Sequence, residues 1–207
     1  MAGEDRRRQL LEVAIDLFSK NGFGGTTTRE IAHAAGVTEA IIFRHFATKQ
    51  DLYAAILDHI RITVGTDRWP VEVQALMDRN DDEGLFRRIM ASIVQMHRTQ
   101  PRFERLMLHA ALEGHELAVM HHNRMMLAMG RPLLEYIERR QRDGALRGCD
   151  AMAVILAVAG MARAWAMQKY LYQICESPAS DEETIESFVR ILMNGLRTAT
   201  IQEGEDS

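Results

Sequence analysis

Three helix-start signals fall within residues 26–53, TTTREIAHAAGVTEAIIFRHFATKQDLY, and only short gaps separate them. Thr27 and Glu30 have the spacing of a capping box, and Thr38 and Thr48 each stand at the start of a further helical stretch. Helices this short are marginal in isolation, so they must buttress one another. The segment therefore predicts a small helical bundle whose turns fix the position of its second short helix.

The rest of the 207 residues also favours helix. Pro is scarce (4) and Met is plentiful (13), and no run alternates β-branched or aromatic residues with polar ones between turn signals. We expect an all-α chain of about nine helices, with a first domain over 1–50 and a second over 51–207, and a linking region at 65–84 that holds at most one short helical turn. Outside 26–60, helical periodicity predicts helices over about 4–21, 84–98, 101–113, 116–143 (bent or restarted near Gly130), 150–175 and 181–202.

Export and membrane insertion are disfavoured. The N-terminus becomes amphipathic at once and lacks an apolar segment followed by a cleavage site, which predicts a cytoplasmic protein. The apolar stretch 151–167 is rich in Ala and carries Arg163, so we expect a helix buried between protein partners and no membrane span. Cys149 and Cys175 form no CxxC pair and are expected to stay thiols.

The short helix over 39–46 has two dissimilar faces. At 100° per residue Ile42 and Phe46 fall together, where they can pack against the preceding helices, and Ala40 and Arg44 lie opposite. A small side chain beside an Arg suits a DNA groove, because the backbone can approach and the Arg can donate to a phosphate or a guanine edge. Two interpretations stay open at this point: a helix-turn-helix, or the edge of a bundle that binds nothing.

Net charge does not decide between these two interpretations. Residues 1–60 contain seven Lys and Arg against eight Asp and Glu, a net charge of −1. DNA binding therefore requires the positive groups to gather on one face. The basic residues at helix starts or on the outward helix are the ones expected to contact phosphate: Arg6, Arg7, Arg8, Arg29, Arg44 and Lys49.

A family resemblance favours the helix-turn-helix. Residues 8–53 contain the elements AxxLFxxxGF, TTxxEIAxxAGV, FRHF and KxxLY, and in combination they resemble the DNA-binding domain of TetR-family transcriptional regulators. The resemblance implies a three-helix DNA-binding head and a helical C-terminal domain that dimerises and often holds a small ligand. Carried over by position, it implies phosphate contacts from Thr27, Thr28, Arg29 and Lys49, and groove contacts from Glu39, Ala40, Phe43, Arg44 and His45.

The sequence departs from the family at the groove-facing positions. Members often have Lys, Gly and Thr where this chain has Glu39, Ala40 and Ile41, and Tyr where it has Arg44. These changes preserve the docking mode, but a base preference cannot be carried over. Glu39 would repel a phosphate, so we expect its carboxylate to face a cytosine amino group or a water.

The last two helices each have more than one apolar face. The 150–175 segment is apolar almost all round, and the 181–202 segment has one stripe through Ile185 and Val189 and a second through Phe188 and Ile191. A homodimer with a four-helix interface would cover both helices, as the resemblance also implies. The alternative is that they form the core of a monomer.

A ligand site is expected among segments that could converge in the second domain. Met and aromatic side chains with a few polar ends recur there at helical spacing, which suits an apolar or aromatic effector. For each residue alone, ordinary core is the simpler interpretation. The set is Met90, Ile93, His97, Phe103, Met107, Met161, Trp165, Gln168 and Tyr172.

These observations predict a ligand-responsive regulator, most simply a repressor that binds a palindromic operator in double-stranded DNA as a dimer and is released by its effector. One alternative is a helical metal-dependent hydrolase using histidines between His97 and His122, although their spacing is poor for a metal site. Another is a protein-interaction module. The sequence shows no nucleophile elbow or phosphate loop, and we expect no catalytic residue, metal or cofactor.

Overall fold

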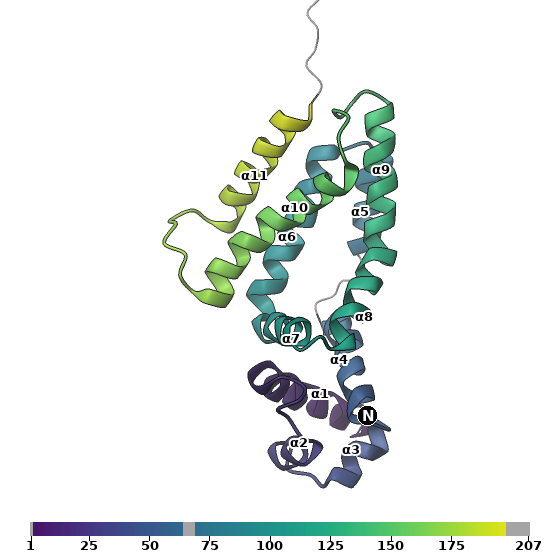
Figure 1. Cartoon of the computed structure of the whole chain (residues 1–207), viewed down its shortest axis with the longest axis vertical. Helices are drawn as coiled ribbons and strands as arrows, with labels where there is room; N and C mark the ends of the chain where they lie inside the picture. The colour runs from purple at the N-terminus through teal and green to yellow at the C-terminus, as the bar shows by residue number, and fades with distance from the viewer. Residues whose placement is uncertain (1, 64–68, 198–207) are drawn as a thin grey trace, which may run out of the picture.

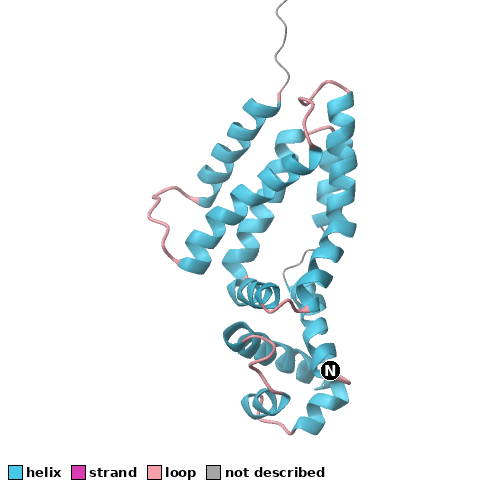
Figure 2. Cartoon of the chain, viewed as in Figure 1, coloured by secondary structure: helices cyan, strands magenta, loops and turns pink. Residues whose placement is uncertain are grey.

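The computed structural model of the chain describes residues 2–63 and 69–197, and all of its regular elements there are helical (Figure 2). This confirms the all-α class, with eleven α-helices and two π-helical segments in the described residues. In order they are α1 (Ala2–Asn21), α2 (Thr28–Ala34), α3 (Glu39–His45), α4 (Lys49–Thr63), α5 (Trp69–Asp78), α6 (Asp82–Thr99), α7 (Pro101–Leu112), α8 (Glu116–Met125), η2 (Met126–Gly130), α9 (Arg131–Arg142), α10 (Ala151–Ala166), η3 (Met167–Tyr172) and α11 (Asp181–Leu196).

The linking region differs from expectation. Half of it is α5, a helix of 10 residues whose Val73 and Met77 are buried, and α6 already begins at Asp82. A linking region was expected here because residues 65–84 contain Pro70, two Gly and an acidic cluster. Proline at the start of a helix is instead compatible with the first turn, because the amide hydrogen it lacks has no intrahelical partner there.

One of the long C-terminal segments is interrupted where its sequence predicts it. The helical run from Glu116 changes to a π-helical segment at Met126–Gly130 and restarts as α9, with Pro132 in its first turn. This confirms the expected restart near Gly130, where an added Cβ would lie 2.7 Å from the Met126 side chain. The helical run from Ala151 likewise ends in a π-helical segment at Tyr172. Residues 198–202 of the last expected helix lie outside the described residues.

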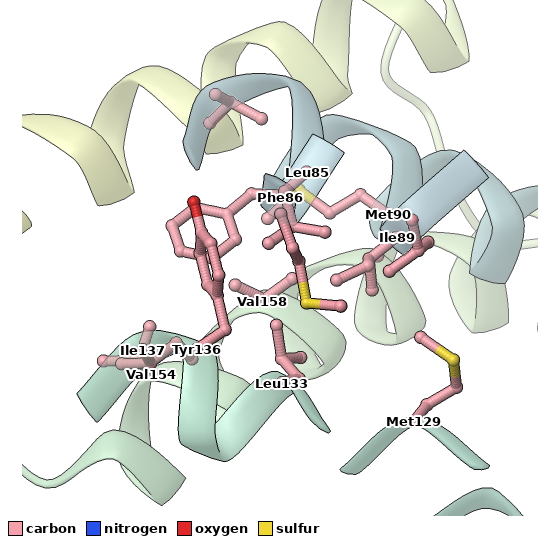
Figure 3. Close-up of a cluster of buried hydrophobic side chains, with 14 of the residues drawn as sticks. Leu85, Phe86, Ile89, Met90, Met129, Leu133, Tyr136, Ile137, Val154 and Val158 are labelled. Carbon is pink, nitrogen blue, oxygen red and sulfur yellow. The ribbon is translucent and has the colours of Figure 1, made fainter. Parts of the chain in front are cut away.

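Two separate apolar cores divide the chain into a head and a body (Figure 1). The head core contains buried residues of α1 to α4 together with Phe103, Leu106 and Ala110 of α7. Helix α7 therefore packs against the head. The body core is formed by α5, α6, α9, α10 and α11, with Phe86, Met90 and Leu133 among its buried residues (Figure 3). The buried side chains of α4 belong to the head core, and the division at residue 50 stays a prediction.

One buried ionic network ties α6 to α9. Asp82 is 8% exposed and accepts hydrogen bonds from the Tyr136 hydroxyl (2.5 Å) and from Arg140 Nε (3.0 Å) and Nη2 (2.9 Å). Burial raises the pKa of Tyr136, and its hydrogen bond to the Asp82 carboxylate raises it further. Because all three polar groups lie in or beside the core, the network holds only while each partner is present.

Replacing the central carboxylate should therefore destabilise the body. We expect Asp82→Ala to lower the free energy of unfolding by about 3 kcal/mol, since it leaves a poorly solvated guanidinium and a buried hydroxyl without their acceptor. Urea denaturation followed by circular dichroism measures the change. Asp143→Ala is the control, because Asp143 makes only an exposed pair with Arg139 at 3.9 Å and should change stability by less than about 0.5 kcal/mol. Equal effects of the two substitutions would contradict the assignment.

Candidate DNA-binding surface and effector region

The geometry of the helix-turn-helix follows from its caps. The Thr27–Glu30 capping box is confirmed: Glu30 N–H donates to Thr27 Oγ1 (3.1 Å), and Thr27 N–H donates to Glu30 Oε2 (2.7 Å). Gly36 has φ +66°, the left-handed conformation that turns the chain towards α3. Thr38 occupies the N-cap of α3, but its side chain makes no capping hydrogen bond, contrary to expectation. The turn rests there on a backbone bond from Ile41 N–H to Thr38 O (3.0 Å).

The two faces of α3 lie as the helical wheel predicts. Ile42 is 0% exposed and Phe46 is 4% exposed, both within the head core. Ala40 and Arg44 are exposed on the opposite side, and Phe43 is 46% exposed. A large exposed aromatic beside an Arg on so short a helix provides apolar contact and a donor on one surface. The α3 face is defined here as Glu39, Ala40, Phe43 and Arg44.

A hydrogen bond that the sequence did not reveal fixes the carboxylate of this face. Thr28 Oγ1, at the start of α2, donates to Glu39 Oε1 at 2.6 Å. The two residues lie 11 apart in sequence and meet only because the turn folds α3 back against α2. Thr28 was expected to contact phosphate, but in this structure its hydroxyl orients Glu39.

Two of the expected basic contacts are available to DNA. Arg29 and Arg44 are exposed, and neither makes a hydrogen bond or ion pair with any other residue in the described part of the chain. The arginines of α1 are also exposed but partly engaged: Arg8 pairs with Asp5 (2.8 Å), and Arg7 lies over the Phe46 ring at 5.0 Å.

His45 and Lys49 are less accessible than expected. His45 is half-buried, and its Nε2 atom has no hydrogen-bond partner within residues 2–63 and 69–197. Lys49 is also half-buried: its ammonium donates to Phe23 O and lies 3.9 Å from the centre of the Phe23 ring. Burial lowers the pKa of Lys49, and the carboxylates of Glu113 and Glu30 oppose that shift. A phosphate contact by Lys49 would have to share the ammonium with Phe23.

The expected effector residues lie on elements that contact one another but in different cores. Helices α6, α7, α10 and the segment η3 pack together around the end of α6. Met90, Ile93, Met161 and Trp165 belong to the body core or pack against it, whereas Phe103 and Met107 belong with the head core. His97 is buried, and Gln168 and Tyr172 are exposed on η3.

Two polar groups beside these residues were missed by sequence reasoning. Glu104 lies 3.6 Å from His97 Nε2, and burial raises its pKa against the opposing effects of His97 and Arg163. Asp181 accepts hydrogen bonds from Trp165 Nε1 (3.1 Å), Lys169 Nζ (3.0 Å) and the Tyr170 hydroxyl. A Trp–x₃–Lys–Tyr spacing gives no sign by itself that the three donors share one acceptor on another helix.

A cavity of about 700 Å³ lies elsewhere, between α5 and α9. Its lining is mostly polar or charged and includes Asp78, Glu135, Arg139 and Arg142. None of the nine expected effector residues lines it. Nothing in this groove selects a chemical class of ligand.

The histidines of the 97–122 region do not converge. His97 Nδ1 bonds the Ile93 carbonyl (2.9 Å), His115 packs on Phe23, and His121 packs edge-on against Phe103. Across the residues described, no three His, Cys, Asp or Glu side chains are placed to share a metal ion. The arrangement gives the hydrolase alternative no support.

Helices α10 and α11 lie side by side on one flank of the body (Figure 1). Each buries one face and exposes large apolar groups on another: Leu156 is 64% exposed and Ile191 is 58% exposed. The helical run Ala151–Tyr172 is long and apolar enough to cross a membrane by length and composition alone, and 28% of its most apolar window is buried within the chain.

Two family models match most of the chain. Residues 10–56 match bacterial regulatory proteins of the tetR family, and residues 90–192 match the tetracyclin repressor-like C-terminal domain. The chain is 34% identical over 104 residues to the HTH-type transcriptional regulator AcrR of Shigella flexneri. That alignment covers 50% of this chain and 47% of AcrR, so the match spans about half the length of this relative.

Two solved structures share the fold over nearly the whole chain. The NalD repressor of Pseudomonas aeruginosa, 19% identical, superposes with a TM-score of 0.68 over 95% of this chain and 98% of its own. AibR in complex with isovaleryl coenzyme A and operator DNA, 21% identical, gives 0.63 over 91% and 98%. These likenesses cover both the head and the body. With the helix-turn-helix geometry and both family models in agreement, the chain belongs to the TetR family of transcriptional regulators, which are not enzymes.

Proposed function

We propose that this protein is a ligand-responsive transcriptional repressor that binds a palindromic operator as a homodimer. The observation that carries the proposal is the α3 face: Ile42 and Phe46 are buried, so Ala40 and Arg44 are turned outward. An outward α3 can enter the major groove while Arg29 contacts the phosphate backbone. The family of its relatives supports the same function.

Dimerisation would use the exposed apolar faces of α10 and α11. Leu156 and Ile191 are largely exposed in the described part of the chain, and a four-helix interface would cover both. A two-fold axis through that interface relates two heads. Each head would then read one half-site, with the half-sites one helical turn, about 34 to 36 Å, or a multiple of it apart.

The effector would bind among α6, α7, α10 and η3 and would favour the conformation that does not bind DNA. The residues proposed to contact it are the nine expected from sequence. AibR, which shares this fold and is in complex with isovaleryl coenzyme A and operator DNA, supports the proposal that this chain responds to a ligand. Our expectation of an apolar or aromatic effector rests on the Met and aromatic side chains of this region. Quenching of Trp165 fluorescence by the same compound that releases DNA would identify the effector.

We place the protein in the cytoplasm, where its DNA would be.

Removing the Arg44 side chain should weaken operator binding. We expect Arg44→Ala to lower affinity at least about tenfold, since each subunit loses one contact to a base or phosphate. Fluorescence anisotropy at several salt concentrations measures it, and wild-type affinity should fall steeply with salt. The control Arg79→Ala removes the same charge from an exposed site on the body and should stay within about threefold of wild type. Equal losses of operator affinity in both variants, or a wild-type affinity that does not change with salt concentration, would contradict the proposal.

The orientation of Glu39 by Thr28 predicts a specific base preference. A fixed carboxylate only accepts hydrogen bonds, so it favours the amino group of cytosine in the major groove. Glutamine keeps the size and an acceptor for Thr28 but adds a donor, which suits adenine. Selection of duplexes with wild type and Glu39→Gln should therefore show one position per half-site changing from cytosine to adenine. Identical preferences in the two proteins would show that residue 39 reads no base.

The dimer interface can be tested by placing charge on it. We expect the double variant Leu156→Asp, Ile191→Asp to sediment as a monomer of about 23.5 kDa and the wild type at twice that mass. Leu112→Asp is the control, since Leu112 is 86% exposed on α7 and lies outside the proposed interface. A double variant that stays dimeric and folded would place the interface elsewhere.

A further inference from the structure

The corner between α7 and α8 contacts the head at the turn between α1 and α2, close to the start of α4. The turn between α1 and α2 meets the corner between α7 and α8, where Phe23 N–H donates to Glu113 Oε2 at 3.2 Å. Gly22 permits this approach for two reasons: its φ is +72°, and a Cβ there would lie 1.9 Å from Glu113 Oε1. A side chain at position 22 would displace the carboxylate. Glycine at position 22 therefore leaves room for the Glu113 carboxylate to contact this turn.

The carbonyl group of the same residue is held by the start of α4. Phe23 O accepts a hydrogen bond from the Lys49 ammonium, which also lies over the Phe23 ring. Lys49 is the first residue of α4, and three residues separate it from the end of α3. Phe23 is thus bonded through its N–H to Glu113 at the α7–α8 corner and through its carbonyl to Lys49 at the start of α4.

Aromatic packing surrounds this connection. The His115 ring lies 4.2 Å from the Phe23 ring and 4.8 Å from the Tyr53 ring, and Phe23 and Tyr53 are 4.9 Å apart between ring centres. Tyr53 is 1% exposed, and burial raises its pKa. Its hydroxyl is buried and has no hydrogen-bond partner among the described residues, which is unfavourable for a buried polar group. Rings from the α1–α2 turn, from α4 and from the α7–α8 connection therefore pack together at this corner.

We propose that Glu113 is a positioning residue that sets the angle of the DNA-binding head. The group formed by Phe23, Lys49, Glu113 and His115 is called here the corner clasp. This inference rests on the proposed function, and it deepens that function by naming a link from the α7–α8 corner through Phe23 to the start of α4. A movement of α7 reaches α3 through Glu113, Phe23 and Lys49 in turn.

Glu113 restricts the orientation of the DNA-binding head, and it contributes little to the free energy of unfolding. Glu113 is exposed, so the free energy gained from its single hydrogen bond is modest. One base pair inserted between half-sites moves them about 3.4 Å apart and rotates one against the other by about a tenth of a turn. A dimer whose heads are held at one angle binds the altered duplex more weakly, whereas a dimer whose heads can change their angle keeps its affinity. Tolerance of half-site spacing is therefore the property that the clasp should control.

The test uses full-length protein and palindromic duplexes from an unbiased selection, with spacings from two base pairs shorter to two longer than the optimum. Wild type should lose at least about tenfold in affinity for each base pair added or removed. Glu113→Ala should bind the optimal duplex within about threefold of wild type but lose less than about threefold at one base pair away. Amide exchange at Phe23 should also become faster in this variant.

Two controls separate the clasp from other effects. Glu113→Gln keeps an oxygen acceptor for Phe23 and should retain the wild-type spacing profile, and Glu116→Ala removes a neighbouring exposed carboxylate and should also retain it. A Glu113→Ala profile that superimposes on wild type would overturn the inference, as would a Glu113→Gln profile equal to that of Glu113→Ala. If wild type retains no duplex at any spacing, the proposed function itself fails, so the two failures are distinguishable.

Discussion

The burial of Ile42 and Phe46 is the constraint on which the rest of the structure depends. Helix α3 has only seven residues, so its orientation is set by the side chains that it inserts into the head core. With those two buried, Ala40 and Arg44 can only point outward. DNA recognition thus follows from a packing requirement, and the polar residues of α3 determine what is recognised without determining where the helix lies.

Electrostatic attraction to DNA depends on the charged groups close to the helix-turn-helix. The chain carries a net charge of −4, so attraction to DNA cannot come from overall charge. Arginines available for phosphate lie near the helix-turn-helix, while neighbouring carboxylates are engaged by the protein itself. Glu30 is held in its capping box, which lowers its pKa, and Glu39 accepts from Thr28. Holding these carboxylates limits their repulsion of phosphate and, at Glu39, gives the carboxylate a direction that a base can recognise.

Local patterns were sufficient for most helices and for the outward face of α3, because caps and helical periodicity act over a few residues. They failed at α5, where Pro70, two Gly and an acidic cluster predicted a linking region, and at Thr38, whose position was correct but whose side chain makes no capping bond. The bond from Phe23 to Glu113 joins residues 90 apart, and no short-range pattern encodes it. The expected effector residues recur at helical spacing. That spacing gives no sign that Phe103 lies in the head core and Met90 in the body core.

The most direct test of the central claim is selection of bound duplexes from a random pool at physiological salt, comparing wild type with a variant whose α3 face is reversed in charge at Arg44. The account predicts that wild type enriches one inverted repeat with half-sites a whole number of helical turns apart, and that the variant enriches none. Enrichment of the same repeat by both proteins, or no enrichment by wild type, would contradict it.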